Sequence, residues 1–567
     1  MASKLSLFLA ELRRRKVYHV AAVYAAVGVA ISIAVPDLFG AFGFPDWAAP
    51  LIIVVVAIGL PIALVLAWAY EVRPEEPRPS EPPAEIVLPS PEPAAPTAVT
   101  VKEQRKSIVV LPFDNMSPDP GDAYFSDGLT EEIITKLSYL RSLRVISRTS
   151  AVALRGTQKN TRAIAEELNV QYVLEGSVRK AGNELRITAQ LIDATADEHL
   201  WAESYDRDLE DVFRVQIDVA ENIALAMRTE FSATEKEMVR RIPTGNLKAY
   251  DLYISALRAW EGMLPEDLAE ATELAQEAIR LDPEYAQAHA FLAELYAISG
   301  FYANERPSDL YPKLAAAATR ALELDSQVGE AHVAMAVIRL FRDWDWAGAE
   351  EEFTRAFELS PDYSPAYRWK AEFLLCSGRF GEAEAASRQG LVSDPLSPDG
   401  HQILGQVLAT GGKPREAIQL LESSVLHWPK YPHLHLWLGL SHLYAGDPQS
   451  ALPPIDAAVA LSGAVPFFEA VRGIVLAAVG RVTEAREVLE DLKARSSSEY
   501  VDPYNLFNLT ATLDGFDDAA PYLDEALEVR SFFLPLLGVV PRYRPLHSDP
   551  RFRAVLEKVG PDVTFEV

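Results

Sequence analysis

The chain has 567 residues, which at roughly 150 residues per domain predicts three or four modules. Hydrophobic residues make up 49% and charged residues 24%, a globular composition that excludes wholesale disorder and a protein embedded entirely in a membrane. The net charge is −28, and because so acidic a body repels phosphate backbones, we expect no nucleic-acid partner. The single cysteine, Cys376, excludes intrachain disulfides and cysteine-based zinc or iron–sulfur sites.

Residues 1–72 contain two long uncharged runs. Val17–Val35 follows the cations of Arg13–Lys16, and Pro50–Tyr70 follows a short loop that lacks Lys and Arg. Each run is long enough to cross a hydrocarbon core of about 30 Å as a helix, and cations flank the pair on both sides. The sequence therefore predicts a two-helix transmembrane hairpin at about 17–35 and 50–70, with the body of the chain in the cytoplasm. A cleaved signal peptide is the alternative.

Residues 73–104 are rich in proline, with nine prolines between Arg73 and Pro96. Such a composition favours an extended polyproline conformation of about 3.1 Å per residue. We therefore predict a Pro-rich linker that spaces the membrane segment from the body. A role as a PxxP ligand is the alternative.

Residues 105–235 alternate between the patterns of strand and helix. Short apolar or alternating runs predict strands, and apolar residues at every third or fourth position predict helices. Strands are predicted at Ser107–Phe113, Leu143–Arg148, Tyr172–Val178, Glu184–Asp193 and His199–Arg207, with helices at about 119–140, at Thr161–Leu168 and from Asp211 onwards. The order β-α-β-α-β-β-β-α predicts an α/β module with a mixed sheet.

Several stretches of this module resemble a known domain. They include SIVVLPFDNMSPDPGDAYFSDGLTEEII, LRVISRTS and YVLEGSVRKAGNELRITAQLIDA, which begin at Ser107, Leu143 and Tyr172. The module resembles the TolB amino-terminal-like domain, which bacterial proteins combine with tetratricopeptide repeats. The apolar segments ahead of it resemble the membrane hairpin of such proteins, which implies a multi-pass protein of the bacterial inner membrane. The resemblance implies no established catalytic activity.

We expect no cofactor and no metal. The module has neither GxxxxGK[ST] nor GxGxxG after a strand, so nucleotide binding has no motif support. Asp127, Glu131 and Glu132 admit a metal interpretation, but acids near a helix N-terminus more often complement the helix dipole. The histidines between 427 and 442 lack acids or thiols at ligand spacing, so packed or surface histidines are the better interpretation.

A 34-residue period runs through the second half of the chain. Small residues are needed where paired helices approach closely, and Pro or Gly where the chain leaves a helix. Three markers keep the step: Ala349, Ala383, Ala417, Ala451, Ala485 and Ala519; then Pro361, Pro395, Pro429 and Gly463; then Gly378, Gly412 and Gly446. We predict that Ala383, Ala417 and Ala451 are buried where two helices meet.

A 34-residue period with these markers resembles the tetratricopeptide repeat. The resemblance implies an all-α solenoid over residues 246–545, with about eight helical hairpins and a groove lined by the first helix of each unit. Residues 546–567 are predicted to form a capping helix and tail. Before residue 349 the spacing is longer, and we assign the extra length to a loop insertion at Tyr302–Pro312. The predicted fold class is multidomain: transmembrane hairpin, linker, α/β module, repeat solenoid.

Offsets from the periodic alanines identify candidate groove residues. The six candidates are Arg342, Arg368, Gln402, Gln406, His433 and Tyr444. Because the predicted lining becomes apolar towards residues 433–478, we predict a protein or peptide ligand, extended or helical, with apolar anchors. A solvated concave face without a ligand is the alternative.

Three classes of function are weighed. The leading one is a non-enzymatic, membrane-tethered scaffold or regulatory protein that binds peptide or protein partners through its repeats. The second is a sensor in which the α/β module binds a small ligand and the repeats relay its state. The third is an enzyme, but no nucleophile–base constellation, cofactor loop or metal cluster is evident, so we expect no catalytic residues.

Overall fold

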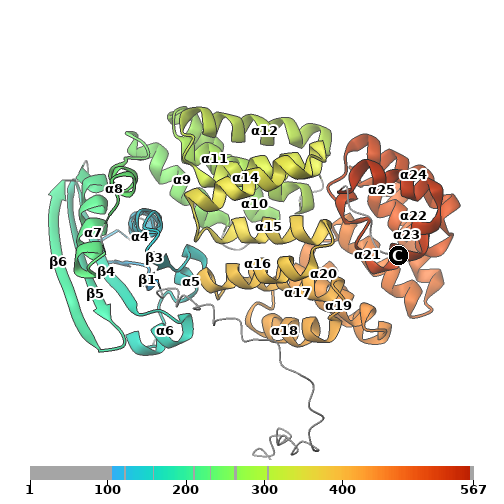
Figure 1. The fold of residues 1–567 in the computed structure, drawn as a ribbon, viewed down its shortest axis with the longest axis horizontal. Coiled ribbons are helices and arrows are strands. Elements are labelled where there is room, and N and C mark those ends of the chain that lie inside the picture. The colour runs from blue at the N-terminus through green and yellow to red at the C-terminus, as the bar shows by residue number, and fades with distance from the viewer. Residues whose placement is uncertain are drawn as a thin grey trace, which may run out of the picture. The chain divides into compact units, whose positions relative to one another are not determined.

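The computed structural model describes residues 105–119, 123–157, 159–208, 211–229, 231–260, 265–302 and 305–561. Within these residues an α/β module comes first in the chain and helical repeats follow it (Figure 1). The predicted linker at 73–104 lies outside the described residues. So do both predicted membrane spans.

The predicted transmembrane hairpin does not stand. Among the residues that the structure describes, no helix combines the length and the apolar character needed to cross a bilayer. The runs at 17–35 and 50–70 lie outside those residues, and an uncharged run of sufficient length is by itself only a candidate span. The fold class is therefore corrected to an α/β module followed by a helical solenoid. The multi-pass inner-membrane location, which rested on the same two runs, is withdrawn.

The α/β module is built around one mixed sheet. Its strands are β1 (Lys106–Val110), β2 (Asp114–Asn115), β3 (Leu143–Val145), β4 (Tyr172–Ala181), β5 (Glu184–Asp193) and β6 (Glu198–Asp208). Its helices are α4 (Ala123–Ser138), α5 (Arg148–Ala153), α6 (Thr161–Leu168), α7 (Val212–Ala226) and α8 (Ala233–Arg240). The predicted alternation of strand and helix is observed, with β2, α5 and α8 as additional elements.

The sheet joins a parallel half to an antiparallel half. Its order is β3-β1-β4-β5-β6, with β2 paired to β4. Strand β1 runs parallel to β3 and β4, in register Val109 to Val173, whereas β4, β5 and β6 form an antiparallel meander. Burial follows this division: Ile108, Val109 and Val110 are fully buried, as expected of a central parallel strand, while β6 is mostly exposed at the edge.

The repeats are consecutive helical hairpins. The pairs are α9 (Leu247–Ala259) with α10 (Pro265–Leu281), α11 (Ala286–Tyr302) with α12 (Pro307–Leu324), α13 (Gly329–Ile338) with α14 (Trp346–Leu359), α15 (Ser364–Cys376) with α16 (Phe380–Ser393), α17 (Pro398–Thr410) with α18 (Pro414–His427), α19 (Pro432–Tyr444) with α20 (Pro448–Ser462), α21 (Pro466–Ala478) with α22 (Val482–Arg495), and α23 (Pro503–Leu513) with α24 (Phe516–Val529). Residues 530–549 then lead through two 3₁₀ turns to α25 (Pro550–Val559).

Small residues set the distance between paired helices, as the period predicts. The six periodic alanines all lie on second helices of pairs and are fully buried. Gly405 of α17 lies so close to Leu421 of α18 that a Cβ would come within 2.6 Å of the leucine side chain. Gly378, between α15 and α16, has φ of +72°, a conformation that only glycine adopts at little cost.

The turn between α13 and α14, one period before Gly378, has no glycine at the equivalent position. Trp344 lies one period before Gly378 and also has positive φ (56°), and it follows a π-helical turn at Arg339–Asp343. A π turn adds a residue to the helix and often marks a locally strained site.

The predicted loop insertion at Tyr302–Pro312 is wrong. The extra length extends α11 and α12, and Pro312 lies inside α12.

The first repeat is packed into the α/β module. Tyr250 and Ile254 of α9 belong to the same apolar core as β1, α4 and α7. The Tyr250 hydroxyl donates a hydrogen bond to the Gly128 carbonyl at 2.7 Å, and the Gln216 side chain donates to the same hydroxyl at 3.2 Å. The module and the repeats are therefore connected by shared core as well as by chain.

Candidate functional site

Two cavities open on the surface formed by the first helices of the pairs. We call this the first-helix surface, since neighbouring first helices such as α15 and α17, or α21 and α23, contact each other. The larger cavity, of about 460 Å³, lies between this surface and the α/β module, and we call it the junction cavity. The smaller one, of about 60 Å³, lies beneath residues 533–542, and we call it the groove cavity.

Five of the six predicted groove residues line the groove cavity. They are Arg368, Gln402, Gln406, His433 and Tyr444. The sixth, Arg342, lies on the π-helical turn, where its guanidinium pairs with the neighbouring Asp343 at 2.7 Å. Arg342 misses the cavity because the π turn breaks the regular offset from Ala349 on which its assignment rested.

The polar groove residues form a buried hydrogen-bonded chain. The Gln402 amide donates to the Gln406 side-chain oxygen at 2.9 Å, and the Gln406 amide donates to the Glu372 carboxylate at 3.1 Å. Burial raises the pKa of Glu372, while nearby Arg368 and the Gln406 hydrogen bond lower it. A buried chain of this kind fixes the orientation of each amide, so the polar wall of the cavity is preorganised.

His433 and Arg368 have different roles in the same wall. Burial, with the positive charge of Arg368, lowers the pKa of His433 to about 3, so the imidazole is neutral near pH 7. Its ring packs edge-on against Phe468 at 4.9 Å between centroids. The Arg368 guanidinium lies 4.1 Å from the Trp369 ring centroid and 3.4 Å from the Asp399 carboxylate. It is therefore held by an aromatic face and an anion together.

The chain's own C-terminal segment covers the groove. We use this name for residues 530–548, whose Phe532 and Phe533 are almost fully buried. Phe532 stacks on Tyr311 at 4.7 Å, and Phe533 lies between Phe467 at 4.7 Å and Tyr504 at 5.1 Å. The alternative of a solvated concave face is therefore not observed over this stretch, since an aromatic segment of the same chain occupies it.

Sequence reasoning missed the aromatic partners on the first helices. Phe467 lies one period after His433 and also lines the groove cavity, so the same offset carried one unit further would have identified it. Phe301 gives no such signal, because it lies in the part of the chain where the spacing is irregular. The Phe301 ring lies 5.3 Å from Phe532 and 5.6 Å from Phe533.

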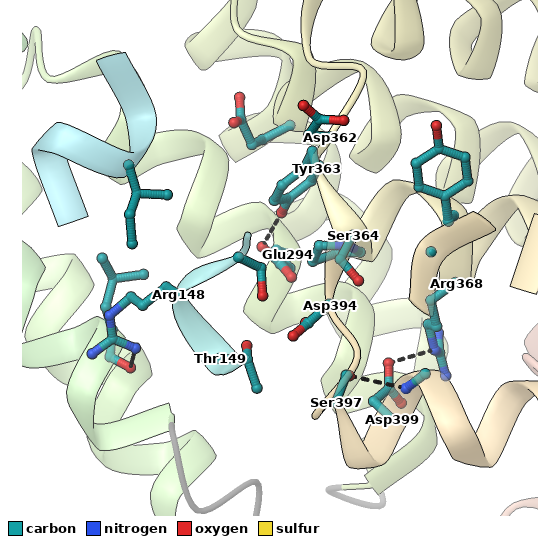
Figure 2. A pocket seen from close by; sticks show the side chains of 18 of the residues that line it. Arg148, Thr149, Glu294, Asp362, Tyr363, Ser364, Arg368, Asp394, Ser397 and Asp399 are labelled. Atoms are coloured by element: carbon teal, nitrogen blue, oxygen red, sulfur yellow. Dashed lines mark hydrogen bonds and ion pairs between the residues drawn. The ribbon is translucent and has the colours of Figure 1, made fainter. Parts of the chain in front are cut away.

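The junction cavity has one wall from each part of the molecule. Helices α4 and α5 contribute from the α/β module, and α9, α11, α13, α15 and α17 contribute from the repeats. Figure 2 shows Glu294, Ser364 and Asp394 near its middle, with Arg148 on one side and the Arg368–Asp399 pair on the other. Its volume lies within the range of about 300–1,000 Å³ found for small-molecule pockets.

Polar contacts hold the two walls in place. The Arg105 guanidinium binds both carboxylate oxygens of Asp362, at 3.0 and 2.8 Å. The Ser150 hydroxyl donates to Asp394 at 2.5 Å and accepts from the Leu396 amide at 2.9 Å. These contacts join residues more than 240 positions apart in the chain: the first links the residue before β1 to the loop between α14 and α15, and the second links α5 to the loop between α16 and α17.

Neither metal ligation nor a reactive thiol is indicated. In the described residues there is no group of three or more His, Cys, Asp or Glu side chains able to hold a metal ion. Cys376 is fully buried, and this burial raises the pKa of its thiol well above the usual range. A buried thiol of raised pKa is a poor nucleophile.

Comparisons with known families match the two parts of the chain separately. Residues 404–467 match a tetratricopeptide repeat family, and the hairpins described above have that architecture, so the helical part consists of tetratricopeptide repeats. Residues 104–226 match the family described as the second domain of HilA/YgeH-like transcriptional regulators. The resemblance of this module to the TolB amino-terminal-like domain stays a prediction.

One curated relative shares substantial sequence with the chain. It is "Putative adenylate cyclase 3" of Rhizobium meliloti (strain 1021), which is 42% identical over 238 residues. The match covers 41% of this chain, and the chain spans only 40% of the length of that relative. The activity in that name is therefore a statement about the other protein.

Several solved structures are similar to the chain at a lower level of sequence identity. The Cut9–Hcn1 assembly of the APC/C is 15% identical, covering 62% of this chain and 63% of that chain with a TM-score of 0.40. Pseudomonas aeruginosa pilF is 20% identical, covering 40% of this chain and 96% of that chain with a TM-score of 0.30. These values are too low for a conclusion about function.

Proposed function

We propose that this chain is a non-enzymatic interaction protein whose tetratricopeptide repeats bind a polypeptide segment carrying adjacent aromatic anchors. The observation that carries the proposal is the C-terminal segment itself, which lies across the first-helix surface with Phe532 and Phe533 buried in it. Peptide recognition in grooves uses apolar anchors for affinity and polar contacts for register. Both kinds of contact are present here within one chain.

The anchors are well enclosed. Gly300 leaves room for Phe532, since a Cβ at that position would come within 2.4 Å of the ring. Phe533 stacks on Phe467 at an interplanar angle of 14° and on Tyr504 at 18°. Full burial of a phenylalanine contributes about 1.5–3 kcal/mol, and favourable ring geometry adds about 0.5–1.5 kcal/mol. A partner peptide that carries two such anchors gains the same contributions to its binding free energy.

Polar contacts fix the position of the segment along the surface. The Tyr311 hydroxyl donates to the Arg530 carbonyl at 2.9 Å, and the Ser531 hydroxyl donates to Asp502 at 2.9 Å. Further on, the Arg542 guanidinium donates to the Asn508 side-chain oxygen at 2.9 Å. We infer that a partner segment with the same order of groups, two aromatics followed by apolar residues, competes for this site.

The test uses a labelled peptide with the sequence of residues 530–543 and the full chain carrying Phe532→Ala and Phe533→Ala. The double substitution empties the anchor sites of the chain's own segment, so the peptide should bind in trans. We expect binding, measured by fluorescence anisotropy, to be at least about ten-fold tighter than to the wild-type chain, whose site is occupied.

Two controls make the result specific. A peptide in which both phenylalanines are alanine should lose binding, and adding Tyr444→Ala to the double variant should weaken it, because Tyr444 lines the groove cavity. Adding Leu426→Ala, at an 83% exposed position of α18, should change nothing. Equal binding of the phenylalanine and alanine peptides would contradict the proposal.

A further inference from the structure

The junction cavity contains more negative than positive groups. Six carboxylates line it: Glu131, Glu294, Glu330, Asp362, Asp394 and Asp399. Two guanidinium groups face them, those of Arg148 and Arg368. Each of these arginines already pairs with one carboxylate, Arg148 with Glu131 at 3.1 Å and Arg368 with Asp399 at 3.4 Å. The cavity therefore has a surplus of negative charge.

Two further carboxylates, those of Asp362 and Asp394, bind side chains that do not line the cavity. Asp362 receives both guanidinium nitrogens of Arg105. Asp394 accepts from the Ser150 hydroxyl, so its oxygen is satisfied by a neutral donor from α5. What remains is the pair of glutamates on α11 and α13, Glu294 and Glu330.

These two glutamates have no cation partner among the described residues. Glu294 accepts a hydrogen bond from the Tyr363 hydroxyl at 2.6 Å, and no ion pair is formed by Glu330 within the described part of the chain. The pKa of Glu294 is raised to about 7, mainly by burial and also by the charges of Glu330 and Asp399, whereas the Tyr363 hydrogen bond and Arg368 lower it. A carboxylate in this environment is stabilised by an incoming cation, because charge that is buried without a counter-ion is costly.

Aromatic rings make up much of the rest of the lining. The rings come from α9, α11, the start of α15 and the loop before α19: Tyr253, Trp260, Phe291, Tyr363, Tyr367, Trp369, Trp428 and Tyr431. Aromatic faces attract cations, and they also cover the apolar body of an organic ligand. An anionic ligand would face the surplus carboxylates, and a bare metal ion lacks a ligand set in the described residues.

We propose that the junction cavity binds an organic cation, with an ammonium or guanidinium head near Glu294 and Glu330 and an apolar body against the aromatic wall. This site shares the Arg368 side chain with the groove cavity, but the proposal does not rest on the function proposed above. The same chemistry has two sources, a free amine or a basic side chain of a polypeptide. Since α4 and α5 form one wall and the repeats the other, the bound cation bridges both parts of the molecule.

The test is calorimetric titration of the intact chain near pH 8 with four probes. Phenethylamine and agmatine represent free amines, the amide of Gly-Gly-Arg represents a basic side chain, and 2-phenylethanol is the neutral match of the first. We expect at least one cationic probe to bind at least about ten-fold tighter than 2-phenylethanol. Which cationic probe binds best assigns the source.

Three variants locate the site. Glu294→Gln and Glu330→Gln keep the side-chain volume and remove the charge, and each should weaken the best cationic probe about ten-fold. Glu422→Gln, an equal change at an exposed position of α18, should leave binding unchanged. The proposal is overturned if 2-phenylethanol binds as tightly as the cations, if no cation binds, or if both cavity variants bind as the wild type does.

Discussion

Small residues at the 34-residue step keep paired helices close together. Single substitutions measure how much each of them contributes to stability. Ala417 is fully buried on α18, and Leu421, one turn later, packs against the bare Gly405 backbone of α17. Protein interiors are packed as densely as organic crystals, so this contact has no room for added methyl groups. The period was visible in the sequence because each repeat needs the same close approach.

The first prediction is that Ala417→Leu destabilises the chain. Overpacking a close helix contact costs about 1–3 kcal/mol, so we expect a lower midpoint in urea unfolding. Leu426→Ala, at an exposed position of the same helix, is the matched control and should leave the midpoint where it is. An unchanged midpoint for Ala417→Leu would mean that α17 and α18 do not meet at this residue.

The second prediction concerns pH and Glu294. The groups that act on this carboxyl are Tyr363, Glu330, Asp399 and Arg368, and burial has the largest effect, raising its pKa from 4.5 to about 7. The folded state therefore keeps the proton at pH values where the unfolded chain has released it. Stability is full below about pH 4.5 and falls as pH rises to 7, by up to about 3 kcal/mol from this group.

Comparing the wild type with Glu294→Gln isolates this contribution, since other buried carboxyl groups such as Asp502, with a pKa of about 6, remain in both chains. Urea unfolding at about pH 5 and pH 8 should show a larger loss of stability for the wild type than for the variant. Parallel pH dependence in the two chains would show that the Glu294 carboxyl is solvated.

At the scale of elements, the sequence predicted strands and helices correctly where the local signals agree with one another. Thr161–Leu168 has the predicted bounds, because an apolar face and a capping Asn160 agree. The strand predicted at Leu143–Arg148 is too long, because the structure ends β3 after Val145 and begins the unpredicted helix α5 at Arg148. What ends the strand is a contact distant in sequence: the Ser147 amide donates to the Ser393 carbonyl at 2.8 Å.

The third prediction tests the start of α5. Ser150→Ala removes the hydroxyl that donates to Asp394 and accepts from the Leu396 amide, and leaves both buried groups without this partner. Such a loss costs about 1–3 kcal/mol, and amide exchange in α5 should become faster. Ser423→Ala on the exposed side of α18 serves as the control. Unchanged exchange in α5 would contradict the contact.

The C-terminal segment shows why part of the site escaped prediction. Its first contact joins Tyr311 to Arg530 across 219 positions, and neither residue carries a local pattern that points to the other. Groove residues could be predicted because a repeat places the same position on the same face in every unit. The occupant of that face could not, since Phe532 and Phe533 lie beyond the last periodic alanine.

The fourth prediction follows from this segment. Phe532→Ala leaves a cavity among Tyr311, Phe301 and Phe341, whose rings lie 4.7, 5.3 and 5.6 Å from the Phe532 ring. Large-to-small changes of this kind cost about 3–5 kcal/mol when the surroundings do not collapse. Differential scanning calorimetry should show a clear loss of stability, and a loss below about 1 kcal/mol would mean that the segment is loosely held.

At the scale of the whole described unit, binding surfaces arise where separate parts of the chain meet. The junction cavity needs α4 and α5 of the α/β module as well as five first helices, and the groove cavity needs the C-terminal segment as well as the repeats. Arg368 lines both cavities, so one side chain connects them. The sequence predicted the α/β module, the repeats and five residues of the groove cavity, whereas Arg342 was misplaced and the cavities depend on packing between parts that became visible only in the structure.

The most direct test of the central claim, that the repeats bind an aromatic-anchored segment on the first-helix surface, is photocrosslinking. The peptide of residues 530–543, with benzoylphenylalanine at the position of Phe533, is irradiated with the Phe532→Ala, Phe533→Ala chain and the attachment sites are found by mass spectrometry. We predict attachment on α21 and α23, near Phe467 and Tyr504, which flank Phe533 in the structure. Attachment only elsewhere in the chain, or no more than a scrambled peptide gives, would contradict the account.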